Sequence, residues 1–418
     1  MKLEIRTMDS SRGPINLRHI RYFCLSAILS VAAAIVVTPL SPSAEAHANS
    51  GNGVDYRGLL IRIDPEHRNQ YPDFLHALTK DFVDGGVIVL QWSTLEPKPG
   101  VYDFSRLDQW IDNIATKHKK ISLGVMAGMF TPDWLYAEPY KVPRNEFRYN
   151  RNPQGKPSCT LLVLPSPWND HFIAQYNRMI TQVARHIRDY QTPDLPRGAA
   201  YSALRIVKLG GINNTSEELR LVANSGDYGP CQQSDARQVW AMAGFSPQKI
   251  EGAWSRLIDN TGRVFDDKIL SVDLIQTGAF PPISNSGVIY TPTPKSVDTL
   301  TTQLVNIALT KYKGRLSVQW NALSQHEFNP AVIDAGKAGA IIAWQMNEFL
   351  GPGEGSGCMY GKQRVKCESP DDFYSILSNG IDHGAQFIEI WARNVDEYEG
   401  SFRRAHEALL ISVARPMD

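Results

Sequence analysis

Four glutamates occupy positions in the sequence from which carboxylates could carry out acid–base chemistry. Glu217 and Glu218 follow one apolar, strand-like run, Glu348 follows another, and Glu389 lies inside a third. A protonated carboxyl group can donate a proton to a leaving oxygen, whereas an ionised one can act as a base or a nucleophile. We therefore predict a catalytic site that uses Glu217 or Glu218 together with a second carboxylate later in the chain.

Glu389 is a rival candidate for that second carboxylate. It stands between Ile388 and Ile390, which would face surrounding helices, so strand alternation points the carboxylate into the interior. A carboxylate in an apolar interior needs a partner or a raised pKa, and both conditions are typical of functional groups. We expect Glu389 either to pair with an arginine such as Arg62 or to contact a ligand.

The segments that must position these side chains are eight apolar, β-rich runs with helical patterns between them. This alternation is typical of parallel sheets, whose strands are buried on both faces. It predicts an α/β fold, a (β/α)8 TIM barrel with long loops after strands 3 and 4. A doubly wound sheet is the alternative, but no glycine-rich phosphate fingerprint follows an early strand. The expected strands are 58–63, 86–91, 121–126, 204–209, 269–275, 316–320, 340–345 and 386–391.

Apolar stripes at helical spacing predict the intervening helices. One stripe contains Leu107, Trp110 and Ile114, and another runs from Phe172 to Ile187, with Asn169 or Asp170 as its N-cap. The long connections, 130–168 and 217–234, both begin at carboxyl ends of strands, where barrel active sites are built.

Composition and the amino terminus narrow the class of protein. The 418 residues include 43 Lys+Arg and 43 Asp+Glu, which leaves no basic surface for nucleic acid. Basic residues, an apolar stretch and the triplet Ala46-His47-Ala48 predict a secretory signal over 1–48, followed by a single domain over 49–418. An uncleaved membrane anchor is the alternative. We expect a secreted or periplasmic monomer that does not contact the membrane once the signal is cleaved.

The cysteines agree with export. Cys24 lies in the predicted signal, and an even number remains, as expected in an oxidising compartment. The favoured pairing joins Cys358 to Cys367 across a short loop and Cys159 to Cys231 between the two long loops. No C-x-x-C pair or H-E-x-x-H motif is present, so we expect neither a metal nor an organic cofactor.

Two motifs carry a family resemblance. Segment 92–104 reads W-x-x-L-E-P-x-x-G-x-Y-D-F, and 131–135 reads T-P-D-W-L. Both resemble segments of the retaining (β/α)8 glycoside hydrolases, the clan that includes β-galactosidases, cellulases and xylanases. Within the first motif, we interpret Glu96 as a turn residue that holds the helix after it.

The resemblance implies catalytic carboxylates after strands four and seven. It assigns acid/base catalysis to Glu217 or Glu218 and the nucleophile to Glu348, with Asn213 or Asn214 as donors to a sugar hydroxyl. The usual form in the clan is Asn followed directly by Glu, whereas here two residues separate Asn214 from Glu217.

Aromatic and polar side chains near the strand ends suit a carbohydrate substrate, because sugars stack on indoles and bind amides and acids. The expected function is hydrolysis of an oligo- or polysaccharide. A non-catalytic carbohydrate-binding barrel for polysaccharide sensing or export, and a transglycosylase, are the alternatives. The expected substrate-binding residues, besides the two asparagines, are Trp92, Trp134, Trp391, Asp64, Gln345, Asn347 and Glu389; Trp320 and Trp344 fall at similar positions.

Overall fold

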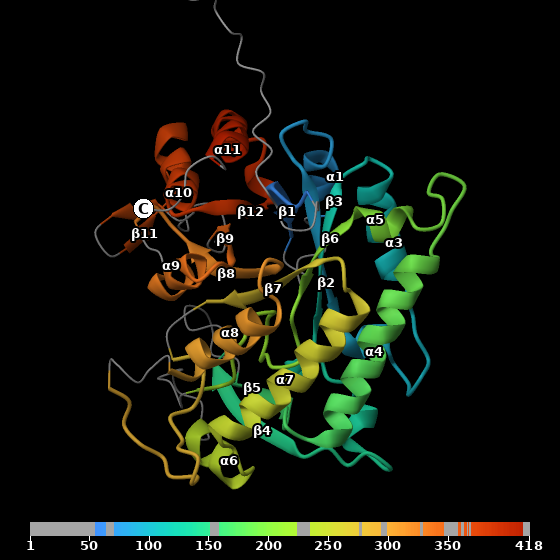
Figure 1. The fold of residues 1–418 in the computed structure, drawn as a ribbon, viewed down its shortest axis with the longest axis vertical. Helices are drawn as coiled ribbons and strands as arrows, with labels where there is room; N and C mark the ends of the chain where they lie inside the picture. Colours follow the sequence, from blue (N-terminus) through green and yellow to red (C-terminus); the bar gives the residue numbers. More distant parts are fainter. Residues whose placement is uncertain are drawn as a thin grey trace, which may run out of the picture. The chain divides into compact units, whose positions relative to one another are not determined.

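Eight parallel strands close into a barrel in the computed structural model (Figure 1). They follow one another around the barrel in chain order, and the last pairs with the first. The predicted (β/α)8 architecture is therefore confirmed. The barrel strands are β1 (Gly58–Arg62), β2 (Gly85–Gln91), β3 (Lys120–Met126), β6 (Leu204–Lys208), β7 (Ile269–Leu274), β8 (Leu316–Leu323), β9 (Ile341–Met346) and β12 (Ala385–Trp391).

The structure describes residues 55–63, 71–150, 159–223, 235–275, 278–293, 299–326, 329–346, 358–360, 363–365, 367 and 369–412. His47–Asp418 forms one compact unit. The predictions for Asp64, Asn347, Glu348, Cys231 and the signal over 1–48 fall outside the described residues and stay predictions.

Strand alternation divides the buried side chains into two clusters. In β2, Val87 and Val89 point into the barrel and pack in an inner cluster that includes Leu60 and Phe387. Ile88 and Leu90 point outward and join the larger cluster beneath the helices. The barrel is therefore filled by side chains along its length, which leaves its carboxyl-terminal mouth for polar groups.

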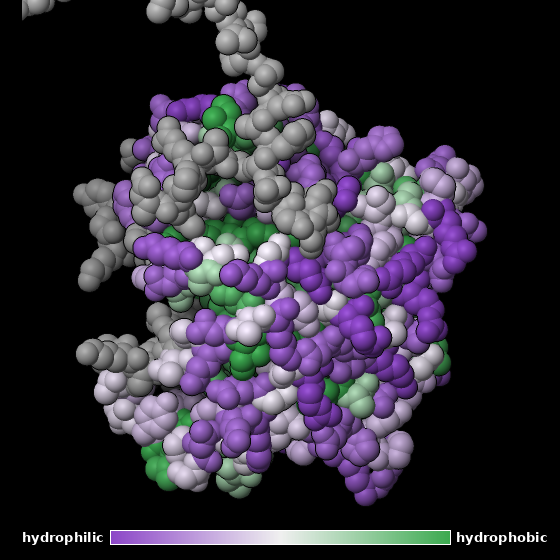
Figure 2. All heavy atoms as spheres, in the orientation of Figure 1, coloured by the Kyte–Doolittle hydropathy of each residue, from purple (hydrophilic) through white to green (hydrophobic). Residues whose placement is uncertain are grey.

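The helices surround the barrel and bury the stripes expected from the sequence. Leu107, Trp110 and Ile114 are buried on α3, and Asn169 caps α4 by accepting hydrogen bonds from the backbone of residues 171 and 172. The surface over α4 and α7 is mainly hydrophilic (Figure 2), as expected for amphipathic helices. The helices are α1 (Tyr71–Ala77), α2 (Trp92–Leu95), α3 (Ser105–Ala115), α4 (Asp170–Asp189), α5 (Ala199–Ala203), α6 (Ala236–Met242), α7 (Pro247–Val264), α8 (Thr299–Lys311), α9 (Pro330–Lys337), α10 (Pro370–Asp382) and α11 (Glu399–Ser412).

Two small sheets lie outside the barrel. The long connection after β3 contains the antiparallel pair β4 (Arg144–Asn150) and β5 (Cys159–Pro165), so part of the expected loop is regular structure. A second pair, β10 (Cys358–Tyr360) and β11 (Gln363–Val365), precedes α10. A disulfide joins Cys358 to Cys367, which confirms that predicted pairing.

Candidate active site

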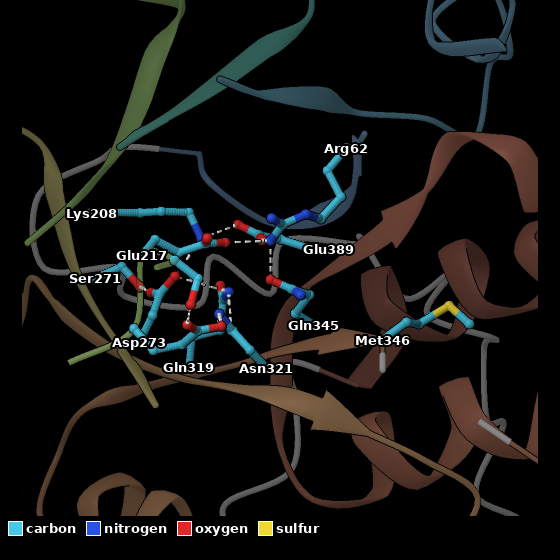
Figure 3. A network of polar contacts seen from close by, with 12 residues as sticks. Arg62, Lys208, Glu217, Ser271, Asp273, Gln319, Asn321, Gln345, Met346 and Glu389 are labelled. Atoms are coloured by element: carbon cyan, nitrogen blue, oxygen red, sulfur yellow. Dashed lines mark hydrogen bonds and ion pairs between the residues drawn. The ribbon is translucent and has the colours of Figure 1, made fainter. Parts of the chain in front are cut away.

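A network of buried charged and amide side chains lies at the carboxyl-terminal mouth of the barrel (Figure 3). At its centre, the Arg62 Nη1 atom donates to Glu217 Oε1 at 2.6 Å and to Glu389 Oε2 at 3.1 Å. The same nitrogen donates to the Gln345 side chain. One guanidinium on β1 therefore holds groups from β9, β12 and the segment after β6.

Glu389 reaches this network because of strand alternation. It pairs in register with Gln345 of β9 and Leu60 of β1, and its side chain is fully buried. On its other side, Lys208 Nζ lies 2.8 Å from Glu389 Oε1. The prediction that Glu389 points inward and pairs with Arg62 is confirmed, and two cations now account for its burial without a role in catalysis.

A second group of polar side chains extends from Lys208 across β7 and β8. Lys208 also pairs with Asp273, which accepts a hydrogen bond from Ser271 at 2.7 Å. Gln319 donates to Asn321 at 2.7 Å, and Asn321 in turn donates to Glu218 Oε1 at 3.2 Å. This group connects the interior ion pairs to Glu218 at the mouth.

The two adjacent glutamates have different partners. Glu217 is bound by the Arg62 cation, whereas Glu218 accepts hydrogen bonds from the neutral Asn321 amide and Ser216 hydroxyl. Arg220 Nη2 approaches Glu218 only to 3.5 Å. Both carboxylates are almost completely buried.

Electrostatics fix the protonation of Glu217. Burial raises its pKa, but the charges of Arg62 and Lys208 lower it by more, to about 2. Glu217 is therefore ionised at neutral pH and, in this arrangement, is a poor proton donor. The same network raises the pKa of Lys208: burial lowers it, but the anions of Asp273 and Glu389 outweigh that effect.

The spacing of two carboxylates is set by their shared arginine nitrogen. The Glu217 and Glu389 oxygens lie 2.6 and 3.1 Å from Arg62 Nη1, so they can be separated by no more than those two distances together. That limit is close to the roughly 5–5.5 Å between the carboxyl groups of retaining glycosidases. However, the two carboxylates of Glu217 and Glu389 are both bound by the Arg62 guanidinium.

Trp92 does not lie at the mouth, contrary to expectation. It is fully buried and packs edge-on against Phe172 and Tyr176, in the core beneath α4. Trp134 packs edge-on against Trp92 but is only half-buried, so its predicted contact with a sugar stays a prediction.

Glu96 has a role beyond the turn predicted for it. Its buried carboxylate accepts from the Trp92 indole at 2.9 Å and from the Gly100 backbone at 2.8 Å, and it pairs with Arg178 of α4. It therefore holds the turn at Gly100 and also anchors α4.

The remaining tryptophans divide between core and site. Trp391 lies beside the network, where the Arg62 guanidinium stands 4.9 Å from the ring centroid and the indole donates to the Met346 carbonyl. Trp344 is fully buried against Trp320, and Trp320 donates to the Ile275 carbonyl. Of these three, Trp391 is the one that contacts the charged network.

Asn213 holds two loops together, and its predicted contact with a sugar hydroxyl stays a prediction. Its side chain accepts from the Ala127 backbone at 3.2 Å and donates to the Ser216 carbonyl at 2.9 Å. Nearby, the backbone of Asn214 passes so close to Gly128 that a Cβ there would collide with its carbonyl oxygen. The Asn214 side chain caps the next residue, since its oxygen accepts from the Thr215 backbone.

The sequence interpretation missed Lys208 and Asp273. Both lie two residues from another inward-facing position, Ile206 and Ser271 respectively, so the alternation rule applied to Glu389 would have placed them in the barrel. Within the described part of the chain, no three His, Cys, Asp or Glu side chains form a group that could hold a metal ion. In the same residues, no helix is both long enough and apolar enough to cross a membrane.

Comparison with known proteins agrees with the resemblance in the sequence. A family model described as beta-galactosidase matches residues 82–188, from the approach to β2 through most of α4. No curated protein matches the sequence significantly. The family match supports glycoside hydrolase activity.

Solved structures share the barrel fold at low identity. The catalytic domain of beta-amylase from Paenibacillus polymyxa is 12% identical with a TM-score of 0.52, covering 87% of this chain and 99% of that one. An exo-beta-1,4-mannosidase from Opitutaceae bacterium strain TAV5 is 11% identical, with a TM-score of 0.47 and coverage of 88% and 63%. An endo-beta-1,4-xylanase from Gloeophyllum trabeum is 13% identical, with a TM-score of 0.44 and coverage of 85% and 97%. The beta-amylase likeness is one of fold.

Proposed function

We propose that the protein is a glycoside hydrolase that cleaves O-glycosidic bonds of an oligo- or polysaccharide by a retaining, two-carboxylate mechanism. The observation that carries this proposal is the group of buried carboxylates at the mouth of a barrel whose 82–188 segment matches a beta-galactosidase family. Barrels of this kind build their active sites at this end.

In this proposal Glu218 is the general acid/base and Glu348 is the nucleophile. A general acid must hold a proton before it can donate it. Glu217 binds the Arg62 cation at 2.6 Å, whereas the hydrogen-bond donors to Glu218 are neutral and the Arg220 cation lies 3.5 Å away. Glu217 instead stays ionised and, through its ion pair, holds the Arg62 guanidinium in place beside the site. The assignment therefore differs from the first expectation in preferring Glu218 over Glu217.

The proposed reaction has two steps. Glu348 attacks the anomeric carbon while Glu218 protonates the departing oxygen, which forms a covalent glycosyl-enzyme. Glu218 then removes a proton from water, and the water displaces Glu348 to release the sugar with its anomeric configuration retained.

We also propose that the protein acts outside the cytoplasm, as a secreted or periplasmic enzyme. The predicted signal over 1–48 and the Cys358–Cys367 disulfide support this location, since disulfides persist in oxidising compartments.

The test is hydrolysis of 4-nitrophenyl glycosides and soluble polysaccharides by the purified protein and its variants. We expect β-galactosides to be the first substrates to try, and Glu348→Gln to abolish turnover. Glu218→Gln should lose ~10²–10⁴-fold on substrates that need acid catalysis. It should lose much less on 2,4-dinitrophenyl glycosides, whose leaving group needs no proton. Glu146→Gln, which changes an exposed side chain of β4, is the control.

A non-catalytic carbohydrate-binding barrel is a second candidate. It is favoured by the ion pairs of Glu217 and Glu389, whose charges Arg62 and Lys208 neutralise. If the protein binds a glycan but releases no reducing ends from any substrate, this second function replaces the first. Transfer of sugar to an acceptor other than water would identify a transglycosylase.

A further inference from the structure

A groove of about 470 Å³ opens beside the first two barrel strands, and its lining comes from residues at one end of the barrel. Ile63 directly follows β1 and Thr94 lies in α2, the short helix after β2, while Tyr71 and Ser105 begin α1 and α3. Helices in this fold run antiparallel to the strands, so their first turns lie level with the strands' carboxyl ends. The groove therefore opens on the same face as the Arg62 network.

The groove has an aromatic and apolar floor. Trp110 and Ile63 are buried, and the half-buried Tyr71 meets Trp110 edge-on with their ring centroids 5.3 Å apart. Asn113 holds the Tyr71 hydroxyl with a hydrogen bond of 2.6 Å, which fixes the ring. A rigid aromatic ring of this kind suits the flat C–H face of a sugar.

Around this floor stands a rim of hydrogen-bonding groups. Thr94, Ser105 and Gln109 are exposed, and Arg106 is half-buried among them. The Gln109 side chain has no hydrogen-bond partner among the described residues. No carboxylate is among the described residues that line the groove. Hydroxyl and amide groups above an apolar floor match the donors and acceptors of an uncharged polyol.

The position of the groove relates it to the proposed reaction. Ile63 directly follows Arg62, whose side chain points into the barrel and binds Glu217. Ile63 packs instead in the outer cluster. The groove thus lies on the outer side of the barrel wall, and the carboxylates lie on the inner side. A chain of sugars that extends from the carboxylates across the edge between β1 and β2 would reach the groove. Its volume falls within the roughly 300–1,000 Å³ of small-molecule sites.

We propose that this groove binds an uncharged sugar unit of a polysaccharide, away from the bond that is cleaved. The inference rests on the proposed function for its substrate class, and it adds that the natural substrate is a polymer long enough to occupy both sites. A monosaccharide glycoside would reach only the carboxylates.

The experiment measures polysaccharide binding without requiring catalysis. The purified protein is run in native gels that contain galactan, xylan, galactomannan or mixed-linkage β-glucan, and retardation gives the affinity. Tyr71→Ala removes the stacking surface, and the double variant Thr94→Ala/Gln109→Ala removes exposed rim groups with little effect on folding. Tyr190→Ala, a half-buried tyrosine just after α4 at the opposite end of the barrel, is the matched control.

We expect at least one polysaccharide to retard the protein and both groove variants to bind it roughly five- to tenfold more weakly. The ratio of kcat/KM on that polymer to kcat/KM on a 4-nitrophenyl monosaccharide should fall by a similar factor, and the control should match the unaltered protein. If no polysaccharide retards the unaltered protein, or if the double variant binds as tightly as the unaltered protein does, the proposed sugar site in the groove is wrong. If the groove variants bind a polysaccharide more weakly but the protein hydrolyses no substrate, the sugar site in the groove is supported and the proposed function is wrong.

Discussion

Two adjacent glutamates at the mouth of the barrel differ in the groups that bind their carboxylates. Glu217 and Glu218 are neighbours in the chain, yet Glu217 binds a guanidinium and Glu218 binds an amide and a hydroxyl. A cation stabilises the ionised form of a carboxyl group, whereas neutral donors do so less strongly. The identity of the proton donor therefore depends on contacts rather than on distance along the chain.

The Glu217–Arg62 pair predicts a pH dependence of stability. The folded-state pKa of Glu217 is about 2, below its ordinary value of 4.5, so its contribution is present above pH 4.5 and is lost as the pH falls toward 2. We expect Glu217→Gln to be less stable than the wild type at pH 7 and to lose less stability in this acidic range. Urea unfolding at a series of pH values measures both slopes, and parallel curves would contradict the prediction.

Removal of Glu389 should destabilise the barrel. Glu389→Gln deletes the anion that Arg62 and Lys208 share in a fully buried position, and breaking such a pair costs about 3 kcal/mol. Glu146→Gln, which changes a half-exposed side chain, should alter stability by ~0.5 kcal/mol or less. Equal urea midpoints for the two variants would show that the buried network contributes nothing to stability.

At the scale of elements, helix α4 is fixed by polar contacts at its beginning and along its side. Asn169 caps its first turn, Tyr176 donates to the Val125 carbonyl of β3 at 2.8 Å, and Arg178 pairs with the buried Glu96. These contacts connect α4 to the segment after β2, where the family motif lies. The conspicuous W-x-x-L-E-P residues Trp92 and Glu96 thus serve the packing of a helix.

The N-cap of α4 gives a test at this scale. Asn169→Ala removes the acceptor for two backbone N–H groups and should cost about 1 kcal/mol. Asp170→Ala removes an exposed carboxylate that pairs with Arg256, and should cost ~0.5 kcal/mol or less. Thermal unfolding of both variants distinguishes the two N-cap candidates that the sequence left open, and a larger loss for Asp170→Ala would reverse their order.

For the whole molecule, the Cys358–Cys367 disulfide closes a short loop before α10. Its two cysteines are nine positions apart in the chain, so the bond should stabilise the fold by about 2–3 kcal/mol by restricting the unfolded chain. The double variant Cys358→Ala/Cys367→Ala should unfold at a lower temperature than the unreduced wild type. A further decrease in the melting temperature of this variant on addition of reductant would support the predicted Cys159–Cys231 pair. A double variant that melts at the same temperature as the wild type would contradict the expected stabilisation by Cys358–Cys367.

The order of elements was predictable from the sequence because its signals are local. Alternation in segments such as 386–391 and the stripes of α3 and α4 depend on neighbouring residues, and eight repeats of strand and helix indicate a barrel. The same local rule placed Glu389 inside the barrel. The β4–β5 hairpin was not anticipated, because its pairing joins two segments of a connection interpreted only as a long loop.

Only the tertiary structure decided which groups meet at the mouth. Arg62 lies 155 positions from Glu217 and 327 from Glu389, so no pattern of neighbours could show that one guanidinium holds both. For the same reason the sequence suggested that Trp92 faces a sugar, whereas it packs against α4 in the core. Residue types at strand ends indicated carbohydrate chemistry, but burial and partners from distant strands determine which carboxylate is held ionised by a close cation and which accepts hydrogen bonds from neutral groups.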